Sequence, residues 1–300
     1  MQRLRELTAS SKGSADWRSH GRGSIGAVSR RSAGVLGRLA GLSPRRRLLV
    51  LGCVLATAGL AAFGIVTLTG GDGDVVRADR PVPTQAEAGP VVLVPGYGGE
   101  ARTLDVLAAQ IRATGRQVSV VRLPASGTGD LHEQAAVVDE YVSNALREGA
   151  PSVDLIGYSA GGIVARLWSQ EHDGAHKARR IITIGSPHHG TTLAAAGAAA
   201  LPGACPTACQ QLVPGSHLLA GLVTPVVHPP AWLSLWTVQD QTVTPPDSAR
   251  LEGAISLSVQ SVCPALKVEH SQLPANPVVV RMVLAAIAPG PLAPPTSAAC

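Results

Sequence analysis

The chain has 300 residues, 45% of them hydrophobic, and a formal net charge of +5. With a mean hydropathy of +0.21, this composition excludes a disordered chain and suffices for one large α/β domain or two small ones. Aromatic residues make up only 3% of the sequence, so few side chains are available to stack on nucleic-acid bases. The net charge alone would suggest an acidic partner.

The positive charge is confined to residues 1–47. This segment carries eleven Lys and Arg residues against Glu6 and Asp16, a net charge of +9, which leaves −4 for the rest of the chain. It is rich in Ser, Gly and Arg and has no sustained apolar period, so we expect a disordered basic arm. The segment that follows indicates that the arm sets the orientation of a membrane segment and argues against nucleic-acid binding.

An uncharged apolar segment spans residues 48–71. As a helix, its 22-residue stretch at 48–69 would be about 33 Å long at about 1.5 Å per residue, which matches one bilayer core. Basic residues precede it and acidic residues follow it. The positive-inside rule therefore predicts a single-pass cell-membrane anchor with a cytoplasmic arm and an extracytoplasmic remainder. The alternative is a cleaved signal and a secreted protein, because residues 56–58 (Ala-Thr-Ala) offer a cleavage site.

After a Gly-, Asp- and Pro-rich linker at 72–88, strands and helices alternate through a domain at 89–288. Short apolar runs predict strands, and apolar residues at helical spacing predict helices. The predicted strands span 91–94, 118–121, 153–156, 181–184, 233–238 and 255–259, and the predicted helices span 104–111, 131–149, 162–168 and 277–288. This alternation indicates a mostly parallel sheet with helices on both faces and functional residues at the carboxyl ends of its strands.

Two segments depart from the alternation. Residues 194–230 form an Ala-, Gly- and Pro-rich insertion, which we interpret as a cap or lid above the sheet, although an exposed excursion without a role is the alternative. Residues 289–300 form a Pro- and Ala-rich tail, for which we expect disorder.

Four cysteines follow the apolar segment and allow three disulfide pairings. Cys205 and Cys209 are four residues apart, so we favour a small disulfide loop in an oxidising compartment. A zinc site is less favoured, because no second Cys or His cluster at ligand spacing accompanies the pair. Cys263 and Cys300 form the residual pair.

Residues 154–162 read as a strand, a G-x-S-x-G motif and the start of a helix. A nucleophile on such a tight turn needs small residues two positions to either side, and Gly157 and Gly161 meet that need. The turn would expose the Ser159 hydroxyl and place the Ala160 N–H at a helix N-terminus, where it can donate to an oxyanion. We interpret Tyr158, beside the nucleophile, as a packing residue.

The loop after the first strand supplies a second expected oxyanion donor. It reads PGYGG at 95–99, and we expect the Tyr97 N–H to be that donor. Pro95 stands where many hydrolases have His. The alternative is that the glycines only make a tight strand exit.

A serine nucleophile needs a general base, and the base needs an acid that fixes its tautomer. In the order Ser, Asp or Glu, His, the base must follow the acid and lie late in the domain. His270 meets this requirement. Asp240 directly follows the strand at 233–238, whereas Asp247 lies seven residues later behind two prolines, so we favour Asp240 as the acid.

His188 and His189 are adjacent at a strand exit. Adjacent side chains of an extended segment point in different directions, so they rarely share one ion. We therefore interpret this pair as part of a structural or substrate-lining loop, and we expect neither a metal nor a cofactor.

In this order, the segments PGYGG, GYSAGG, GSPHHGT, WTVQDQTVTPP and VEHSQLP resemble the compact bacterial class 2 lipases and related secreted α/β-hydrolases. The resemblance spans roughly residues 89–288. It implies an α/β-hydrolase fold with Ser159 as nucleophile, Asp240 as acid, His270 as base, and Tyr97 and Ala160 as oxyanion donors. Pro95 and the long cysteine-bearing insertion depart from the family's pattern and leave the substrate open.

The function expected from these residues is hydrolysis of carboxylic esters, with a small-molecule or lipid ester as substrate, by a monomer. An acyltransferase of the cell envelope that uses the same three residues is the alternative within this class, because excluding water would divert the acyl group to an alcohol. A non-catalytic scaffold with a hydrolase fold is the alternative from another class.

Overall fold

The computed structural model describes residues 80–99, 101–200 and 203–300. The arm at 1–47, the apolar segment at 48–71 and the first part of the linker lie outside the described residues. Within the described ranges, no helix is long and apolar enough to cross a membrane.

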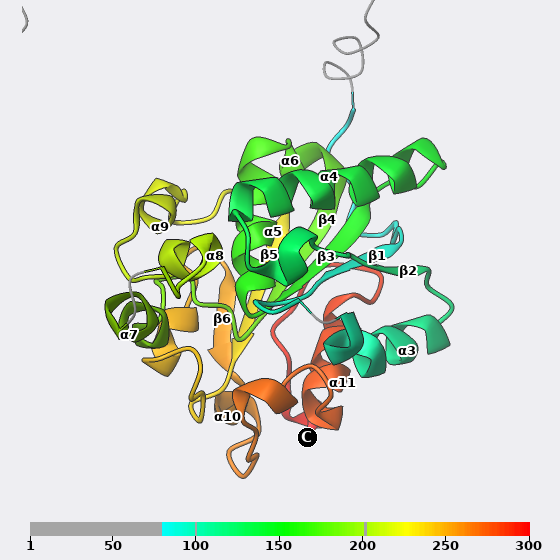
Figure 1. The fold of residues 1–300 in the computed structure, drawn as a ribbon. Helices are drawn as coiled ribbons and strands as arrows, with labels where there is room; N and C mark the ends of the chain where they lie inside the picture. Colours follow the sequence, from blue (N-terminus) through cyan, green and yellow to red (C-terminus); the bar gives the residue numbers. More distant parts are fainter. Residues whose placement is uncertain (1–79, 100, 201–202) are drawn as a thin grey trace, which may run out of the picture. The chain divides into compact units, whose positions relative to one another are not determined.

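Six parallel strands form one sheet in the order β2-β1-β3-β4-β5-β6 (Figure 1). The strands are β1 Val91–Val94, β2 Val118–Val120, β3 Val153–Tyr158, β4 Ala178–Ile184, β5 Ala231–Trp236 and β6 Ile255–Ser258. Every residue of β1, β3 and β4 is buried, which explains why these strands are mostly apolar. The parallel sheet that the alternation predicts is thus confirmed.

Helices cover both faces of the sheet (Figure 1). The α-helices are α3 Asp105–Ala113, α4 Leu131–Arg147, α5 Ala160–Glu171, α6 Gly174–Lys177, α7 Thr192–Ala200, α8 Thr207–Gln211, α9 His217–Gly221, α10 Val259–Val262 and α11 Pro277–Ala286. One apolar core lies beneath α4 and α5, and a second lies beneath α3 and α11. The sheet is therefore the middle layer of three, as in doubly covered α/β folds.

The predicted helices appear close to their expected positions. In α3, the side chains at 107, 108 and 111 are buried, as their spacing predicts. Helix α4 begins after Asp130, whose side chain accepts a hydrogen bond from the N–H of His132 and caps the helix.

Strand β4 begins three residues earlier than predicted. Arg179 and Arg180 lie in the strand and are buried, which the charge of their side chains argued against. Arg179 Nε donates to Asp154 Oδ1 at 2.8 Å, and Arg180 Nη1 donates to the carbonyl of Ala288 at 2.9 Å. These partners lie far away in the sequence and satisfy the buried cations.

Strand β5 spans Ala231–Trp236, two residues earlier than the predicted range of 233–238. The chain leaves the sheet at Thr237, whose hydroxyl donates to the carbonyl of Val268 at 2.7 Å. Val238 is 50% exposed and donates its N–H to the side chain of Gln260. Its apolar side chain had extended the predicted strand.

The tail at 289–300 has defined contacts, in contrast to the disorder that the sequence predicted. Cys300 forms a disulfide with Cys263, and Arg281 Nε donates to the carbonyl of Ala299 at 2.8 Å. Gly290 donates its N–H to the carbonyl of Gln85. The Pro- and Ala-rich composition predicted disorder, but composition cannot show that a disulfide and the buried Arg180 hold the tail.

The insertion at 194–230 contains regular structure. It holds most of α7, together with α8 and α9, which group together beside the sheet (Figure 1). A disulfide joins Cys205 to Cys209 at the start of α8. The pairing that the sequence favoured among three is therefore confirmed for both disulfides.

Candidate active site

Ser159 lies on a strained turn between β3 and α5. Its backbone angles are φ 55° and ψ −128°, a conformation that L residues rarely adopt. A Cβ at Gly157 would collide with the carbonyl of Gly161, and a Cβ at Gly161 would collide with the carbonyl of Val94. The two glycines of the motif are therefore required by close backbone approach, as the sequence predicts.

The structure brings Ser159, His270 and Asp240 together, and we refer to them as the triad. His270 Nε2 lies 3.0 Å from Ser159 Oγ, and His270 Nδ1 lies 2.7 Å from Asp240 Oδ2. All three side chains are at least nine-tenths buried. A carboxylate at Nδ1 holds the proton on that nitrogen, which leaves Nε2 free to accept the hydroxyl proton of Ser159.

Asp240 is fixed by its second oxygen. Asp240 Oδ1 accepts hydrogen bonds from the N–H groups of Thr242 at 2.9 Å and Val243 at 2.7 Å. The alternative acid, Asp247, lies in a 3-10 turn at Pro246–Ala249. The structure therefore pairs His270 with Asp240, the residue that the sequence favours.

Tyr158 packs against His270, as expected of a packing residue, and also forms a hydrogen bond to it that sequence reasoning missed. Its hydroxyl donates to the carbonyl of His270 at 3.1 Å, and the two rings lie 5.2 Å apart at a 33° tilt. Burial, and secondarily the charge of Asp240, raise the pKa of the Tyr158 phenol, so it stays a donor. The position of a tyrosine directly before the nucleophile was the only feature of the sequence that could have indicated this hydrogen bond.

The residues that carry the two expected oxyanion donors, Tyr97 and Ala160, lie close to Ser159. Ala160 begins α5 and is buried, so its N–H has no preceding carbonyl within the helix to bond. A Cβ on Gly96 would lie 2.8 Å from Ser159 Cβ, so the loop at 95–99 packs directly against Ser159. Tyr97, the next residue, lines a cavity together with Ser159.

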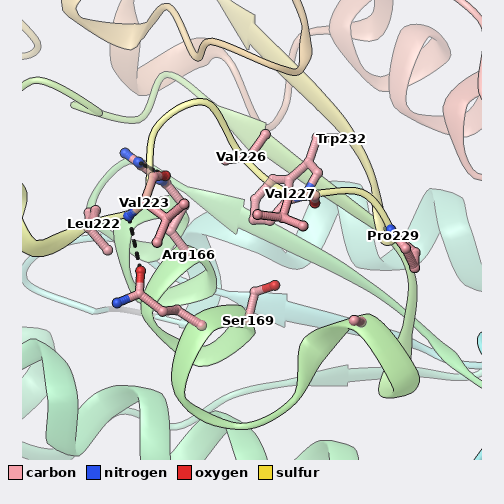
Figure 2. A pocket seen from close by; sticks show the side chains of 10 residues that line it. Arg166, Ser169, Leu222, Val223, Val226, Val227, Pro229 and Trp232 are labelled. Atoms are coloured by element: carbon pink, nitrogen blue, oxygen red, sulfur yellow. Dashed lines mark hydrogen bonds between the residues drawn. The ribbon is translucent and has the colours of Figure 1, made fainter.

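This cavity has a volume of about 150 Å³ and apolar walls. A larger cavity of about 260 Å³ lies between α5 and the segment at 222–232 (Figure 2). The side chain of Gln170 accepts a hydrogen bond from the N–H of Val223 there, and burial lowers the pKa of Arg166 to about 10. No triad residue lines the larger cavity, whereas Ser159 lines the smaller one.

His188 and His189 contact different partners. His188 is buried, its Nε2 lies 3.0 Å from Thr183 Oγ1, and burial and the charge of Arg166 hold its pKa well below the usual range. His189 lies 3.4 Å from Glu252 through Nε2. In the part of the chain that the structure describes, no group of three His, Cys, Asp or Glu side chains could hold a metal ion.

Comparison with known proteins adds two kinds of similarity. A family model described as "Palmitoyl protein thioesterase" matches residues 90–226, which include Ser159 but end before Asp240 and His270. No curated protein sequence gives a significant match.

Solved structures of lipolytic proteins share the fold. Aspergillus fumigatus lipase B is 18% identical with a TM-score of 0.57, and the match covers 75% of this chain and 60% of that one. The fold is that of the α/β-hydrolases. Bacillus licheniformis lipase BlEst2 in its mature form is 20% identical over 65% of this chain and 90% of that one, with a TM-score of 0.50.

A structure from a study of two metagenome-derived lipolytic enzymes, LipS and LipT, is 18% identical with a TM-score of 0.53. The match covers 69% of this chain and 99% of that one. The matches include lipases and a thioesterase family and do not single out the class 2 lipases that the sequence resembles. Together they support a carboxylic ester hydrolase.

Proposed function

We propose that the chain is a serine hydrolase that cleaves carboxylic esters through a covalent acyl-enzyme on Ser159. The observation that carries the proposal is the triad, in which Ser159 Oγ, His270 and Asp240 are joined by contacts of 3.0 and 2.7 Å. The similarity to lipases, esterases and thioesterases supports ester hydrolysis in general.

The geometry suits acyl transfer in two steps. Ser159 Oγ attacks the ester carbonyl while His270 Nε2 takes the hydroxyl proton, and Asp240 stabilises the imidazolium that forms. The N–H groups of Tyr97 and Ala160 then stabilise the tetrahedral oxyanion. As the C–O bond breaks, His270 returns the proton to the leaving alcohol.

Water completes the cycle. His270 accepts a proton from a water molecule, whose oxygen attacks the acyl carbon, and the second tetrahedral intermediate collapses to release the carboxylic acid. The proton goes back to Ser159 Oγ, so the enzyme is regenerated. In the whole cycle, the ester C–O bond is replaced by a bond between the acyl carbon and the oxygen of water.

Acyl thioesters are a second candidate substrate class, because the matching family model is described as a thioesterase. The same triad would release a thiol in place of an alcohol. Parallel assays with an oxygen ester and a thioester of the same acyl group compare the two classes.

We further propose that the hydrolase domain works outside the membrane, tethered by the apolar segment at 48–71. Two disulfides support an oxidising compartment. Alkaline extraction of membranes that contain the full-length chain tests the tether, and external protease tests the orientation. Release into the soluble fraction with a new N-terminus near residue 58 would favour the cleaved signal.

Ser159→Ala in the full-length chain tests the catalytic proposal. We expect loss of p-nitrophenyl ester hydrolysis to the background rate, with unchanged thermal unfolding, because alanine removes only the hydroxyl. Ser152→Ala, at another buried serine, is the matched control and should retain activity. Hydrolysis retained by Ser159→Ala would overturn the proposal.

A further inference from the structure

Two segments without helix or strand carry the acid and the base of the triad. Asp240 ends the segment at 237–240, which leaves the sheet after β5, and His270 directly follows the segment at 266–269. In this described part of the chain, no backbone hydrogen bond joins the two segments. Hydrogen bonds from side chains join them instead.

Thr237 forms the first connection. Its side chain is fully buried, and its Oγ1 donates to the carbonyl of Val268 at 2.7 Å. The same oxygen accepts from Gln260 Nε2 at 2.8 Å and from the N–H of Gln239 at 3.2 Å. A hydroxyl has one donor and two acceptor positions, so all three are used and the hydroxyl is held in one orientation.

Gln239 forms the second connection. Its Oε1 accepts from the N–H of Val268 at 2.9 Å, so both the N–H and the carbonyl of Val268 are bonded to the segment that carries the acid. Gln260 in α10 also contacts this segment, because its Oε1 accepts from the N–H of Val238 at 3.1 Å. We refer to Thr237, Gln239 and Gln260 as the bridge.

The bridge lies close in sequence to both the acid and the histidine. Thr237 precedes Asp240 by three residues, and its carbonyl accepts from the N–H of Asp240 at 3.3 Å. Val268 precedes His270 by two residues. A shift of Val268 away from Thr237 would therefore move the histidine away from the carboxylate, whose Oδ2 lies 2.7 Å from Nδ1.

We propose that Thr237 is a positioning residue, which keeps His270 in hydrogen-bond contact with Asp240. Among the residues that the structure describes around the cavity at Ser159, none belongs to the bridge. The bridge should therefore affect kcat and leave KM nearly unchanged. The inference rests on the proposed function, because turnover needs this acid–histidine pair only if Ser159 is the nucleophile.

Thr237→Val removes the hydroxyl and keeps the shape of the side chain. In the full-length chain, we expect kcat for a p-nitrophenyl ester to fall about 10- to 100-fold, because a misplacement of about 1 Å can cost about 10²-fold. Thr237→Ser keeps the hydroxyl and should restore most of kcat. An unchanged kcat in Thr237→Val, or an equal loss in Thr237→Ser, would overturn the inference.

Thr183→Val is the matched control. Thr183 in β4 is also fully buried, and its Oγ1 lies 3.0 Å from His188 Nε2, so this variant loses a buried hydroxyl contact outside the triad. It should lower the melting temperature about as much as Thr237→Val does and keep wild-type kcat. A similar loss of kcat in both variants would indicate a general loosening of the fold and would contradict a positioning role.

Gln239→Leu removes the second connection and leaves the hydroxyl of Thr237 in place. Gln239 and Gln241 are both exposed and lie on either side of Asp240, so Gln241→Leu is the matched control. We expect kcat to fall about fivefold in Gln239→Leu, the factor equivalent to one neutral hydrogen bond, and to stay at the wild-type value in Gln241→Leu. Equal kcat values for the two variants would contradict the bridge.

A double variant separates positioning from other losses. Asp240→Asn already removes the carboxylate that orients His270, so adding Thr237→Val to it should lower kcat by less than about twofold, whereas independent losses would multiply. A further loss as large as that of Thr237→Val alone would overturn the inference.

The Nδ1–H of His270 gives a readout that does not depend on turnover. In the full-length chain with nitrogen-15-labelled histidine, its proton NMR signal, identified by its loss in Asp240→Asn, should be sharp in wild type and broadened by solvent exchange in Thr237→Val. An equally sharp signal in Thr237→Val would refute the bridge and leave the serine hydrolase intact. Activity that survives in Ser159→Ala would refute the proposed function, while the NMR comparison would still test the bridge.

Discussion

Replacing Asp240 by Asn removes the charge that fixes the histidine tautomer and changes little else in shape. The Asn amide oxygen can still accept from the N–H groups of Thr242 and Val243, which lie 2.9 and 2.7 Å from Asp240 Oδ1. Its NH₂ group then faces His270 Nδ1 and donates to it. That forces the proton onto Nε2, the nitrogen that must accept from Ser159.

The expected loss is large in activity and small in stability. In a Ser-His-Asp triad, the same exchange of Asp for Asn lowers kcat about 10⁴-fold with the geometry intact. At about 1.4 kcal/mol per tenfold change in rate, this loss corresponds to about 5 kcal/mol of transition-state stabilisation. Because both amide contacts survive, the free energy of unfolding should change by about 1 kcal/mol or less.

Steady-state hydrolysis of a butyryl ester and thermal unfolding measure both quantities. Asp247→Asn is the control, since it makes the same exchange at the other candidate acid, and it should keep wild-type kcat. Asp240→Ala leaves buried donors unpaired and should also destabilise the fold by about 1–3 kcal/mol for each. An active Asp240→Asn enzyme, or an inactive Asp247→Asn enzyme, would refute the assignment of the acid.

Two further predictions concern the surroundings of the triad, and a third concerns Asp139 in α4. A Cβ at Gly161 has no room, so Gly161→Ala should lower the melting temperature by several degrees, whereas Gly221→Ala, with open space in α9, should be neutral or stabilising in the same scan. Tyr158→Phe removes the hydrogen bond to the carbonyl of His270 and should lower kcat about tenfold with KM nearly unchanged, and an equal rise in KM would argue for a packing role only. Burial would raise the pKa of Asp139, but hydrogen bonds from Lys177 and Trp168 outweigh the effect of burial and lower that pKa. The ionised Asp139 therefore stabilises the fold above its unfolded pKa of about 3.9. This stabilisation is lost as the pH falls through the lower pKa of the folded state. Acid unfolding of Asp139→Asn should therefore show a smaller loss of stability between pH 5 and about pH 2 than wild type, and identical curves would contradict the assignment.

The features that the sequence predicted correctly are those with short-range signals. Most of β3, the G-x-S-x-G motif and the start of α5 occupy the nine residues 154–162, so local sterics suffice to predict the turn at Ser159. The order of the acid and the histidine followed from the same motif, and the structure brings Asp240 and His270 to Ser159.

The features that the sequence missed depend on distant partners. Tyr158 contacts His270 across 112 positions, and Arg179 contacts Asp154 and the segment after α11. The predicted strand at 181–184 left out Arg179 and Arg180, because no local pattern shows that a buried carboxylate lies on the neighbouring strand. Asp154, itself inside the predicted strand before the motif, was the available clue.

The tail illustrates the same limit. Its Pro- and Ala-rich composition predicts disorder, yet the carbonyl of Gly290 accepts a hydrogen bond from the buried Arg180 of β4, and the last residue of the tail is joined to Cys263. Composition describes the tail itself and contains no information about the surface on which it lies.

The central claim is that Ser159 carries the acyl group, and trapping the enzyme tests it most directly. Treatment with a fluorophosphonate, followed by protease digestion and mass spectrometry, should place a single adduct on the peptide that contains Ser159. Prior incubation with a butyryl ester should slow the labelling, and Ser159→Ala should abolish it. An adduct on another residue, or unchanged labelling of Ser159→Ala, would contradict the account.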